Sequence, residues 1–423
     1  MNNKMKKIIT LITLLVFTTN YATDRLVDPM LSSSNGTTLF TNITSAINAS
    51  VNGDRILVTA GTYNESTITI NKSLQIMPQI SNTIINLNAN IIVSGFAGMK
   101  LEITGFNLGV YSFNSNSSGT ISNRAKVSII ECSSTSIDLN LEGFECNLIK
   151  NNIVNTLSFR YGNLISNTIR NINLYDESLD NPVNSTEKTL IANNIISTSL
   201  FIYNNDTPFI IANNTISGGL YLKRWYANSL RKNKIINNEF NTTKLLVSIF
   251  NVPLYNLTFS NNKGIVSFYN AGLDNGNPPF SQTNLNYNTS NTIYLDSDWY
   301  YSETSNAGLT TSLFPGNNVN GSFEWSYNGF LLPKSAPAGN EPLSFINIAG
   351  TNNIIDSGNP NHEYYDIDLT VNDRGINGGP FSQLNYNATN PNNSKAFIFD
   401  LDMPTDLFPT QTVDIKAKGY HKN

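Results

Sequence analysis

Cationic and aromatic side chains between residues 160 and 234 have the chemistry needed to hold an acidic sugar. Arg and Lys bind carboxylate or sulfate groups, and Trp and Tyr can stack on a sugar ring. The candidate glycan-binding residues are Arg160, Tyr161, Arg170, Tyr221, Lys223, Arg224, Trp225 and Tyr226. A Lys or Tyr in this region could also act as the base of a metal-independent lyase. An alternative stays open, in which the charges only keep an exposed sheet from pairing with its neighbours.

Three aspartates nearer the C-terminus could bind calcium. Asp366, Asp368 and Asp373, together with Asn372, offer oxygen ligands on one turn. Their spacing differs from that of an EF-hand loop, which has acidic residues at alternating positions, a Gly and a terminal Glu. The alternative is that Asp373 and Asn372 cap the turn through their own backbone. Calcium is therefore the one cofactor that the sequence suggests.

Short Asn-marked segments that recur from residue 147 to residue 262 must position the cationic and aromatic residues. Asn193, Asn213 and Asn233 are each twenty residues apart, and Asn151 and Asn167 are sixteen apart. A period near twenty is typical of a solenoid. Each segment has a few β-branched or apolar residues before its Asn, which is too short and too rich in Asn for a helix. The repeats predict short strands that turn at Asn, because Asn tolerates the left-handed backbone region.

A ladder of amides is expected if these strands stack in register. Asn side chains at equivalent corners would then hydrogen-bond along the stack, as in other ladders of identical side chains. The predicted ladder consists of Asn151, Asn167, Asn193, Asn213 and Asn233. This layout is that of a parallel β-helix, an all-β solenoid. An antiparallel sandwich is the alternative, but nothing in a sandwich requires Leu-Ile-x-Asn at a fixed interval.

The overall composition limits the classes of partner. Charged residues make up 13% of the 423 residues and the net charge is -4, so a general nucleic-acid binder, which would be basic, is not expected. Solubility must depend on amides and hydroxyls, a surface that suits contact with sugars. Cys132 and Cys146 are the only cysteines and lie fourteen residues apart, about one coil. They could form a bridge between neighbouring coils or stack as core thiols, and both interpretations stay open.

The first 22 residues are typical of an export signal. Lys4, Lys6 and Lys7 precede an apolar run over residues 8–17, and Ala22 is the expected last residue before cleavage. The run has about ten residues, whereas a membrane span needs about twenty. No later stretch of the sequence is long and apolar enough to cross a bilayer. We therefore expect a secreted protein, extracellular or at the cell surface, with no membrane span after cleavage.

A short helix is expected near the start of the mature chain. Ile43, Ala46 and Ile47 lie on one face of such a helix, and Asn42 or Thr41 can serve as its N-cap. The first coil of a solenoid has an exposed apolar end, which a helix of this kind can cover. Residues 24–80 are therefore predicted to form an N-terminal cap.

The same region resembles a known family. Thr-Ser-Ala-Ile-Asn-Ala at 44–49 is followed by Gly-Asp-Arg-Ile-Leu-Val at 53–58, Ala-Gly-Thr-Tyr-Asn-Glu at 60–65 and Ile-Asn-Lys-Ser-Leu at 70–74. This series resembles the opening of secreted right-handed parallel β-helix proteins of the pectin-lyase-like superfamily. The resemblance implies a right-handed fold. It implies no particular activity, because the same opening precedes lyases, hydrolases, esterases and proteins of no known activity.

A second passage resembles the closing segment of secreted bacterial proteins of this kind. Ile-Asp-Ser-Gly-Asn-Pro at 355–360 and the stretch over residues 366–380 are similar to two turns that end the β-helix in that family. Ser357, beside the Gly, and Leu369, where a Gly is commoner, depart from the pattern. The β-helix is thus expected to span residues 24–384, with 345–384 as its closing segment. Residues 385–423 are expected to form a C-terminal β extension.

The catalytic arrangements that the resemblance implies for the family's enzymes are missing from this sequence. Its hydrolases use clustered Asp with Gly-His-Gly and Arg-x-Lys motifs, whereas His362 and His421 lie outside the repeats and no Gly-His-Gly occurs. Its calcium-dependent lyases need several acids on one face and an Arg base, but the central coils carry few acids and most of these fall in one insert, between 176 and 187. Its esterases need paired Asp on adjacent coils, and no such pair is found.

We therefore expect an exported β-helix that binds an extracellular or cell-surface glycan and has no recognisable catalytic site. The first alternative is a polysaccharide lyase acting on an acidic polysaccharide, with Lys223, Arg231 and Lys234 as candidate catalytic residues. The second alternative is a structural spacer or adhesin segment. The expected partner is a polysaccharide and not a nucleic acid, and the oligomeric state is left open.

Overall fold

The chain folds mainly into β-strands, with one short α-helix among the described residues. Residues 1–21, which hold nearly all of the expected export signal, lie outside these residues. The computed structural model describes residues 22–109, 113–117, 125–134, 139–175, 189–203, 208–223, 233–241, 246–250, 254–255, 257–264, 266–271, 280–281, 284–286, 289–290, 293–296, 318–319, 324–327, 330–332, 355–356, 358–366, 369–382, 397–402 and 416–420.

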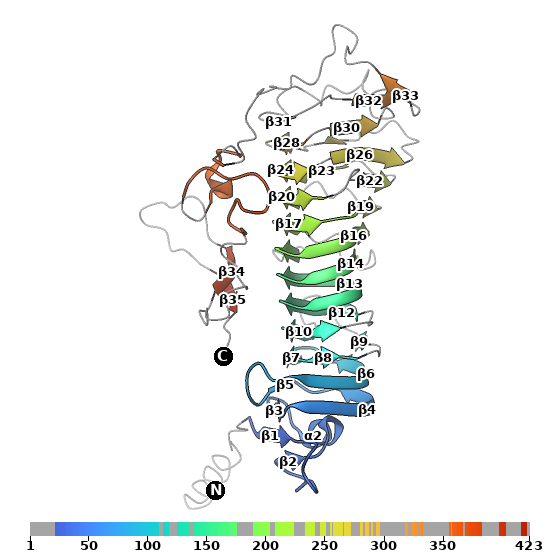
Figure 1. The fold of residues 1–423 in the computed structure, drawn as a ribbon, viewed down its shortest axis with the longest axis vertical. Helices are drawn as coiled ribbons and strands as arrows, with labels where there is room; N and C mark the ends of the chain where they lie inside the picture. The colour runs from blue at the N-terminus through green and yellow to red at the C-terminus, as the bar shows by residue number, and fades with distance from the viewer. Residues whose placement is uncertain are drawn as a thin grey trace, which may run out of the picture.

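Most strands belong to one large curled sheet in which all neighbours except β32 and β33 are parallel (Figure 1). Its strands form three rows, and within a row each strand pairs with the equivalent strand one coil later in the sequence. The first row contains β1 (Asp24–Val27), β3 (Arg55–Val58), β5 (Leu74–Pro78), β7 (Lys100–Thr104), β10 (Lys126–Ile130), β12 (Leu139–Ile149), β13 (Asn152–Ile165), β15 (Thr189–Ala192), β17 (Phe209–Ala212), β20 (Asn233–Ile236), β24 (Leu257–Ser260) and β28 (Asn284–Asn286).

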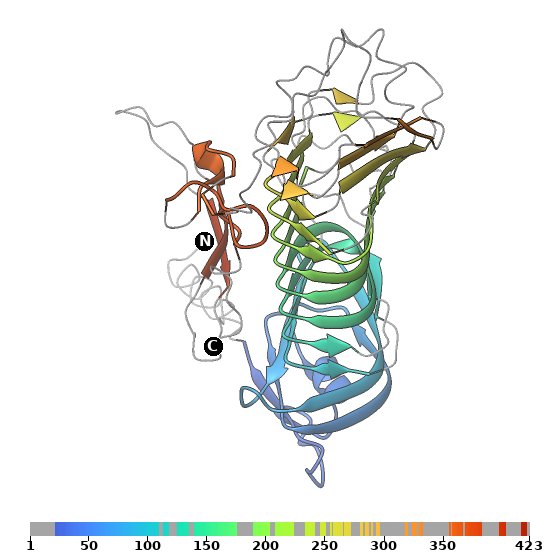
Figure 2. The same cartoon turned by 45° about the horizontal axis from the view of Figure 1, so that its top comes forward.

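The other two rows share several long strands that bend from one row into the next. The second row runs through β4 (Gly61–Ile70), β6 (Ile85–Gly95), β8 (Asn107–Leu108), β11 (Ser133–Ser134), β13, β14 (Thr168–Leu174), β16 (Ile195–Tyr203), β18 (Thr215–Ile216), β21 (Glu239–Phe240), β25 (Lys263–Gly264), β29 (Thr289–Ser290) and β31 (Asn318–Val319). The third row runs through β4, β6, β9 (Phe113–Ser117), β12, β13, β14, β16, β19 (Leu220–Lys223), β22 (Leu246–Phe250), β26 (Val266–Ala271), β30 (Ile293–Asp296) and β32 (Glu324–Tyr327). Figure 2 shows the coils lying one above another.

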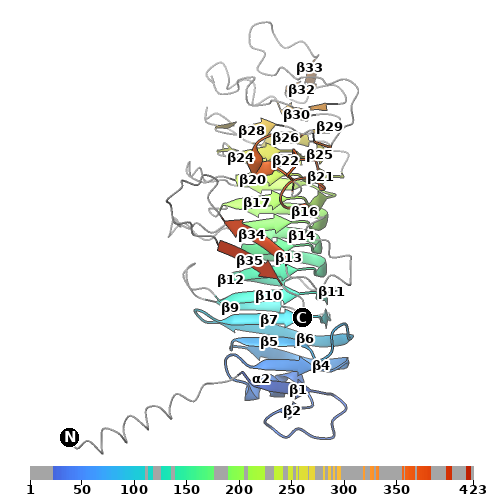
Figure 3. The same cartoon turned by 90° about the vertical axis from the view of Figure 1, so that its left-hand side faces the viewer.

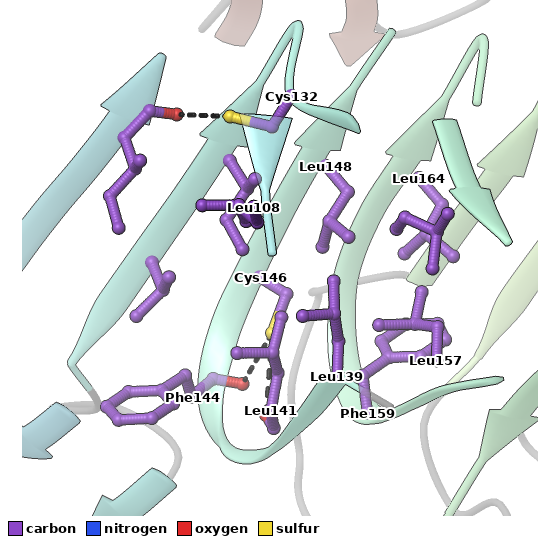
Figure 4. Close-up of a cluster of buried hydrophobic side chains, with 14 of the residues drawn as sticks. Leu108, Cys132, Leu139, Leu141, Phe144, Cys146, Leu148, Leu157, Phe159 and Leu164 are labelled. Atoms are coloured by element: carbon purple, nitrogen blue, oxygen red, sulfur yellow. Dashed lines mark hydrogen bonds between the residues drawn. The ribbon is translucent and has the colours of Figure 1, made fainter. Parts of the chain in front are cut away.

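Apolar side chains from all three rows meet inside the coils. Alternate strand residues point to opposite sides, so the Leu, Ile, Val and Phe at every second position of β10, β12 and β13 reach one continuous core. Figure 4 shows part of it, including Phe144, Leu148 and Phe159. Parallel strands need both faces covered, and the inner faces of the three rows cover one another across this core. The prediction of a largely β chain with parallel strands is confirmed.

Both cysteines belong to this core as separate thiols. Cys132 and Cys146 are buried and unbridged, and they contact backbone carbonyls in Figure 4. Burial raises the pKa of the Cys132 thiol to about 11. Of the two interpretations that the sequence leaves open, the structure has core thiols.

The predicted helix is α2 (Ile43–Ala49), and it lies at the end of the first coils (Figure 1). The Asn42 side chain accepts a hydrogen bond from the Ser45 N–H at 2.8 Å, which is the expected N-cap. Ile43, Ala46 and Ile47 are buried against the first strands. The β2 strand (Leu39–Phe40) pairs with β1 beside it.

Several elements near the C-terminus lie outside the three rows. The β33 strand (Phe330–Leu332) pairs antiparallel with β32, and β23 (Leu254–Tyr255) pairs with β27 (Phe280–Ser281). The β34 (Phe397–Asp402) and β35 (Lys416–Tyr420) strands form an antiparallel pair within residues 385–423, where a C-terminal β extension is expected.

A segment that contains the short 3-10 helix η4 (His362–Tyr364) lies beside the coils, next to β17 and β20, in Figures 1 and 3. The described part of residues 355–382 is called the docked segment below. These residues are predicted from the sequence to end the coil stack, whereas the docked segment lies along its side.

Candidate binding surface

The third row carries stacked aromatic side chains on its outer side. Phe201 and Tyr221 occupy paired positions on β16 and β19, and their ring centroids lie 4.6 Å apart with planes inclined by 13°. Tyr175, directly after β14, stacks on Tyr203 at 4.9 Å and 10°. Phe201 and Tyr203 lie side by side on β16, with centroids 5.9 Å apart. These four residues are called the aromatic wall.

Strand alternation places these rings outside the core. Leu200 and Ile202 on β16 are buried, whereas Phe201 and Tyr203 are only partly buried. In-register pairing repeats this alternation on the next coil and so brings equivalent positions together. Tyr221 is among the candidate residues predicted from the sequence, and the other three rings are not. Phe201 and Tyr221 are twenty residues apart, the interval of the neighbouring Asn markers, and this spacing could have revealed the pair.

The wall cannot hold a sugar by face-to-face stacking along its whole length. Neighbouring rings are nearly parallel, so the stacked faces of Tyr175 and Tyr203 cover each other. Ring edges and Tyr hydroxyls are the groups that a ligand could contact here, and a hydroxyl both donates and accepts hydrogen bonds. Burial, with a smaller contribution from Tyr175, raises the pKa of Tyr203, which keeps its hydroxyl neutral near pH 7.

Two of the predicted cationic residues lie on the coils of the wall. Tyr175 N–H donates to the Phe159 carbonyl, so the next residue of β13, Arg160, lies one coil before Tyr175. Its Nη2 is 3.6 Å from a carboxylate oxygen of Glu142, and an anionic ligand would compete with that carboxylate. Lys223 pairs in register with Tyr203. The side chain of Lys223 lies outside the described structure.

Three other predicted residues lie elsewhere. Arg170 is exposed at an irregularity of β14, between the second and third rows. Tyr161 is buried on the first row, paired with Glu145. Lys234, on the first row, has its Nζ 2.6 Å from Glu363 Oε2 and 5.1 Å from the ring centroid of Tyr364, both on the docked segment. Arg224, Trp225, Tyr226 and Arg231 fall outside the described residues.

Asn side chains form a ladder at the turns that follow the first-row strands. At each step, the side-chain oxygen of one Asn accepts both the backbone and the side-chain N–H of the Asn one coil earlier, at 2.9 to 3.0 Å. The side-chain N–H groups also donate to backbone carbonyls. The ladder consists of Asn151, Asn167, Asn194, Asn214, Asn238 and Asn262.

This ladder corrects three of the five predicted positions. Asn151 and Asn167 belong to it, but Asn193 and Asn213 are each one residue too early and have positive φ angles of 57° and 54°. Asn233 lies in β20, where its side chain accepts from the Phe209 N–H at 3.1 Å. The coil after residue 213 is longer than twenty residues, so the true equivalent of position 214 is 238.

Four asparagines with positive φ form a second column, which holds the docked segment: Asn193, Asn213, Asn237 and Asn261. Asn193 donates to the Phe381 carbonyl at 2.8 Å, and Asn213 donates to the Gly378 carbonyl at 2.6 Å. Asn261 accepts from the Asn359 N–H at 2.8 Å. The left-handed backbone turns these side chains away from the ladder and toward the segment.

The most buried contact of this junction joins Asn237 and Asn372, both fully buried. Asn237 donates to Asn372 Oδ1 at 2.8 Å, and Asn372 donates in return to Asn237 Oδ1 at 3.2 Å. Asn372 also donates to the Tyr364 carbonyl. A satisfied pair of buried amides fixes the position of the segment along the stack.

Apolar contacts complete the junction. Ile165 and Ala192, on the outer side of the first row, form a cluster against which Phe381 packs. Ala212 and Ile236, on the next coils, form a cluster with Tyr364. The docked segment therefore covers an apolar stripe that would otherwise face water.

The two described aspartates of the predicted calcium site bind backbone N–H groups. Asp366 accepts from the Asp373 N–H at 3.1 Å and from the Gly379 N–H. Asp373 accepts from the Asp356 N–H at 2.7 Å. The Asp373 carboxylate thus binds the backbone 17 residues earlier in the chain, and not the backbone of its own turn as the capping alternative states. Asp368 lies outside the described residues, and within those residues no three His, Cys, Asp or Glu side chains are grouped as metal ligands.

Comparison with known proteins gave no significant match to a family model, a curated protein or a solved structure. In the described part of the chain, no helix combines the length and the hydropathy of a bilayer-spanning helix.

Proposed function

We propose that the chain is an exported right-handed parallel β-helix, a solenoid of pectin-lyase-like type, whose aromatic wall binds an extracellular or cell-surface glycan. The three parallel rows and the buried Asn ladder support the solenoid. The handedness and the export come from the resemblance and the signal-like segment in the sequence.

The observation that carries the binding proposal is the aromatic wall. Phe201, Tyr203 and Tyr221 lie on β16 and β19 of the third row, and Tyr175 directly follows β14, the strand before β16 in that row. Their partly buried rings give an apolar surface, and their hydroxyls can bond to sugar hydroxyls. A repeated surface of this kind suits a repeated ligand, such as a polysaccharide.

The contacts of Lys234 favour binding over the lyase alternative. Its ammonium group is paired with Glu363 and lies over the Tyr364 ring, on the first row and not on the wall. A general base must reach the proton that it removes. Lys234 would have to leave both partners to do so.

The test is retention of the protein on columns of immobilised pectate, alginate and chondroitin sulfate. The variant Tyr175→Phe/Tyr203→Phe removes two hydroxyls and keeps the stacked rings, so we expect clearly weaker retention with an unchanged melting temperature. Tyr365→Phe, on the docked segment, is the matched control and should be retained like the unmodified protein.

Two results would reject the binding proposal. Retention of the double variant equal to that of the unmodified protein would show that the wall hydroxyls bind nothing. No retention of the unmodified protein on any column, and no unsaturated product from any of the three glycans, would leave the spacer or adhesin alternative.

A further inference from the structure

A buried carboxylate lies at the N-terminal end of β1. Asp54, in the turn before β3, is fully buried. Its Oδ1 accepts the Thr23 N–H at 2.9 Å, and its Oδ2 accepts the Val51 N–H at 2.9 Å. Arg25 donates from Nε to Oδ2 at 2.8 Å and from Nη1 to the Thr37 carbonyl. One carboxylate thus joins β1 to the turn before β3, and Arg25 extends this contact to the loop before β2.

We propose that export processing between Ala22 and Thr23 converts the Thr23 N–H into an α-ammonium group that forms an ion pair with Asp54 and locks the N-terminal cap. Processing by a signal peptidase is a hydrolysis. Water adds across the amide, Ala22 leaves as a carboxylate, and Thr23 keeps the nitrogen and gains protons. The inference rests on the proposed export, because the cut is that of the export signal.

The geometry needs no rearrangement. Ala22 is exposed, so a peptidase can reach the bond, while Thr23 is already at hydrogen-bond distance from Asp54. A charged donor makes a stronger hydrogen bond to a carboxylate than an amide does. Thr23 is only partly buried, so its ammonium group keeps some water and avoids the full cost of burying a charge.

Among the described residues, few charged groups lie around Thr23 and Asp54. Arg25 shares Asp54, Asp24 pairs with Arg55 at 2.6 Å, and Lys72 donates to the Ile47 carbonyl at 2.8 Å. Burial acts to raise the pKa of Asp54, but hydrogen bonds from the Val51 and Thr23 backbone and from Arg25 outweigh it and leave the pKa lowered. Asp54 is therefore ionised near pH 7, where the α-amino group is protonated, and can act as its partner.

The test compares two preparations that begin at Thr23, one with a free amine and one with a short neutral extension ahead of it. An α-amino group has an ordinary pKa near 8, and a carboxylate partner raises it in the folded state. The added stability is then present below about pH 8 and is lost as the pH rises through the raised value. We expect a higher melting temperature for the free-amine form at about pH 7, and a difference that shrinks toward pH 10.

Matched variants test whether Asp54 is the partner of the Thr23 α-ammonium group. Asp54→Asn should abolish the pH-dependent difference between the two preparations, whereas Asp24→Asn, which removes the exposed carboxylate next in sequence, should preserve it. If Asp54→Asn does not fold, the comparison of the two unsubstituted preparations decides alone. A difference that is constant from pH 7 to about pH 10 would overturn the ion pair.

The site of processing is tested separately by N-terminal sequencing of the protein exported from cells. Thr23 as the first residue supports the inference, and any other first residue overturns the proposed cut. The protein could stay in the cell while the preparation with a free amine at Thr23 still shows the pH effect. This result would reject export but would support the ion pair between Thr23 and Asp54.

Discussion

At the scale of single residues, adjacent asparagines have two different structural roles. In the pairs Asn193–Asn194 and Asn213–Asn214, the first residue has a left-handed backbone and binds the docked segment. The second has its amide inside the turn, in the ladder. Asn suits the first position because it tolerates positive φ. It suits the second because its amide offers both donors and an acceptor.

Removing one amide from the ladder should destabilise the protein. Asn214→Ala leaves the backbone N–H of Asn194 without its side-chain acceptor in a buried turn, which costs on the order of 1 to 3 kcal/mol. Denaturant unfolding measures this loss. Asn361→Ala is the control, because Asn361 is exposed. Equal unfolding midpoints for the two variants would contradict a stabilising ladder.

At the scale of elements, the docked segment explains the composition of the first row. All four residues of β15 are buried, because Leu190 and Ala192 are covered on the outside by the cluster that includes Phe381. A strand covered on both sides has a continuous apolar run and no alternation. The outer cover here comes from the docked segment.

Tyr364→Ala should release the docked segment and leave the coils folded. Tyr364 is buried against Ala212 and Ile236, and its loss removes much of the apolar contact of η4. We expect faster proteolytic cleavage within residues 355–382, which mass spectrometry can monitor. The far-ultraviolet circular dichroism should change little. Tyr365→Ala, at a less buried neighbouring position, should be cut at the original rate.

The same contact should depend on pH at the alkaline end. Burial, followed by the neighbouring Glu363, raises the pKa of Tyr364 well above its usual value, and a hydrogen bond with Thr258 only partly opposes this. The stabilising effect of the neutral phenol is therefore present below about pH 10 and is lost as the pH rises through the raised pKa.

Tyrosinate absorbance can detect this titration. Subtracting the titration curve of Tyr364→Phe from that of the unmodified protein should leave one group that ionises above the ordinary tyrosine range. A difference curve centred near pH 10 would show that Tyr364 is in contact with water.

At the scale of the whole molecule, stability depends on covering the ends of the coil stack as well as on its repeats. Each coil buries its apolar residues against the next, so an uncovered end would present apolar side chains to water. The α2 helix covers the first coils with Ile43, Ala46 and Ile47. Glu65 accepts N–H groups from Ile43 and Thr44 and so holds the start of the helix on β4.

Opening this cap should cause self-association. Ile47→Asp places a charge at a buried position and should detach α2, which exposes the first coil and its strand edges. Sedimentation velocity should then detect oligomers. Asn48→Asp adds the same charge at the exposed next position and should remain in the same state as the unmodified protein. A non-associating Ile47→Asp variant would contradict the capping role of α2.

Some of the fold follows from local sequence alone. The apolar face of residues 43–47 and the Asn42 cap predict α2, and the spacing of the Asn-marked segments predicts stacked parallel strands. The candidate binding surface is harder to predict from local sequence. Tyr221 is found because cationic residues follow it, but Tyr175 and Tyr203 have neighbours in sequence that give no such signal, and the pairing of β14 with β16 brings them together.

The sequence by itself determined where strands form and how often they recur, because alternation and turn preference act over a few residues. Only the tertiary structure decided which asparagine of each pair enters the ladder, which rings stack, and where residues 355–382 lie. Those outcomes depend on the register between coils and on contacts such as Asn237 with Asn372, which are 135 residues apart in the chain. No local pattern can encode them, since each needs the partner surface to exist first.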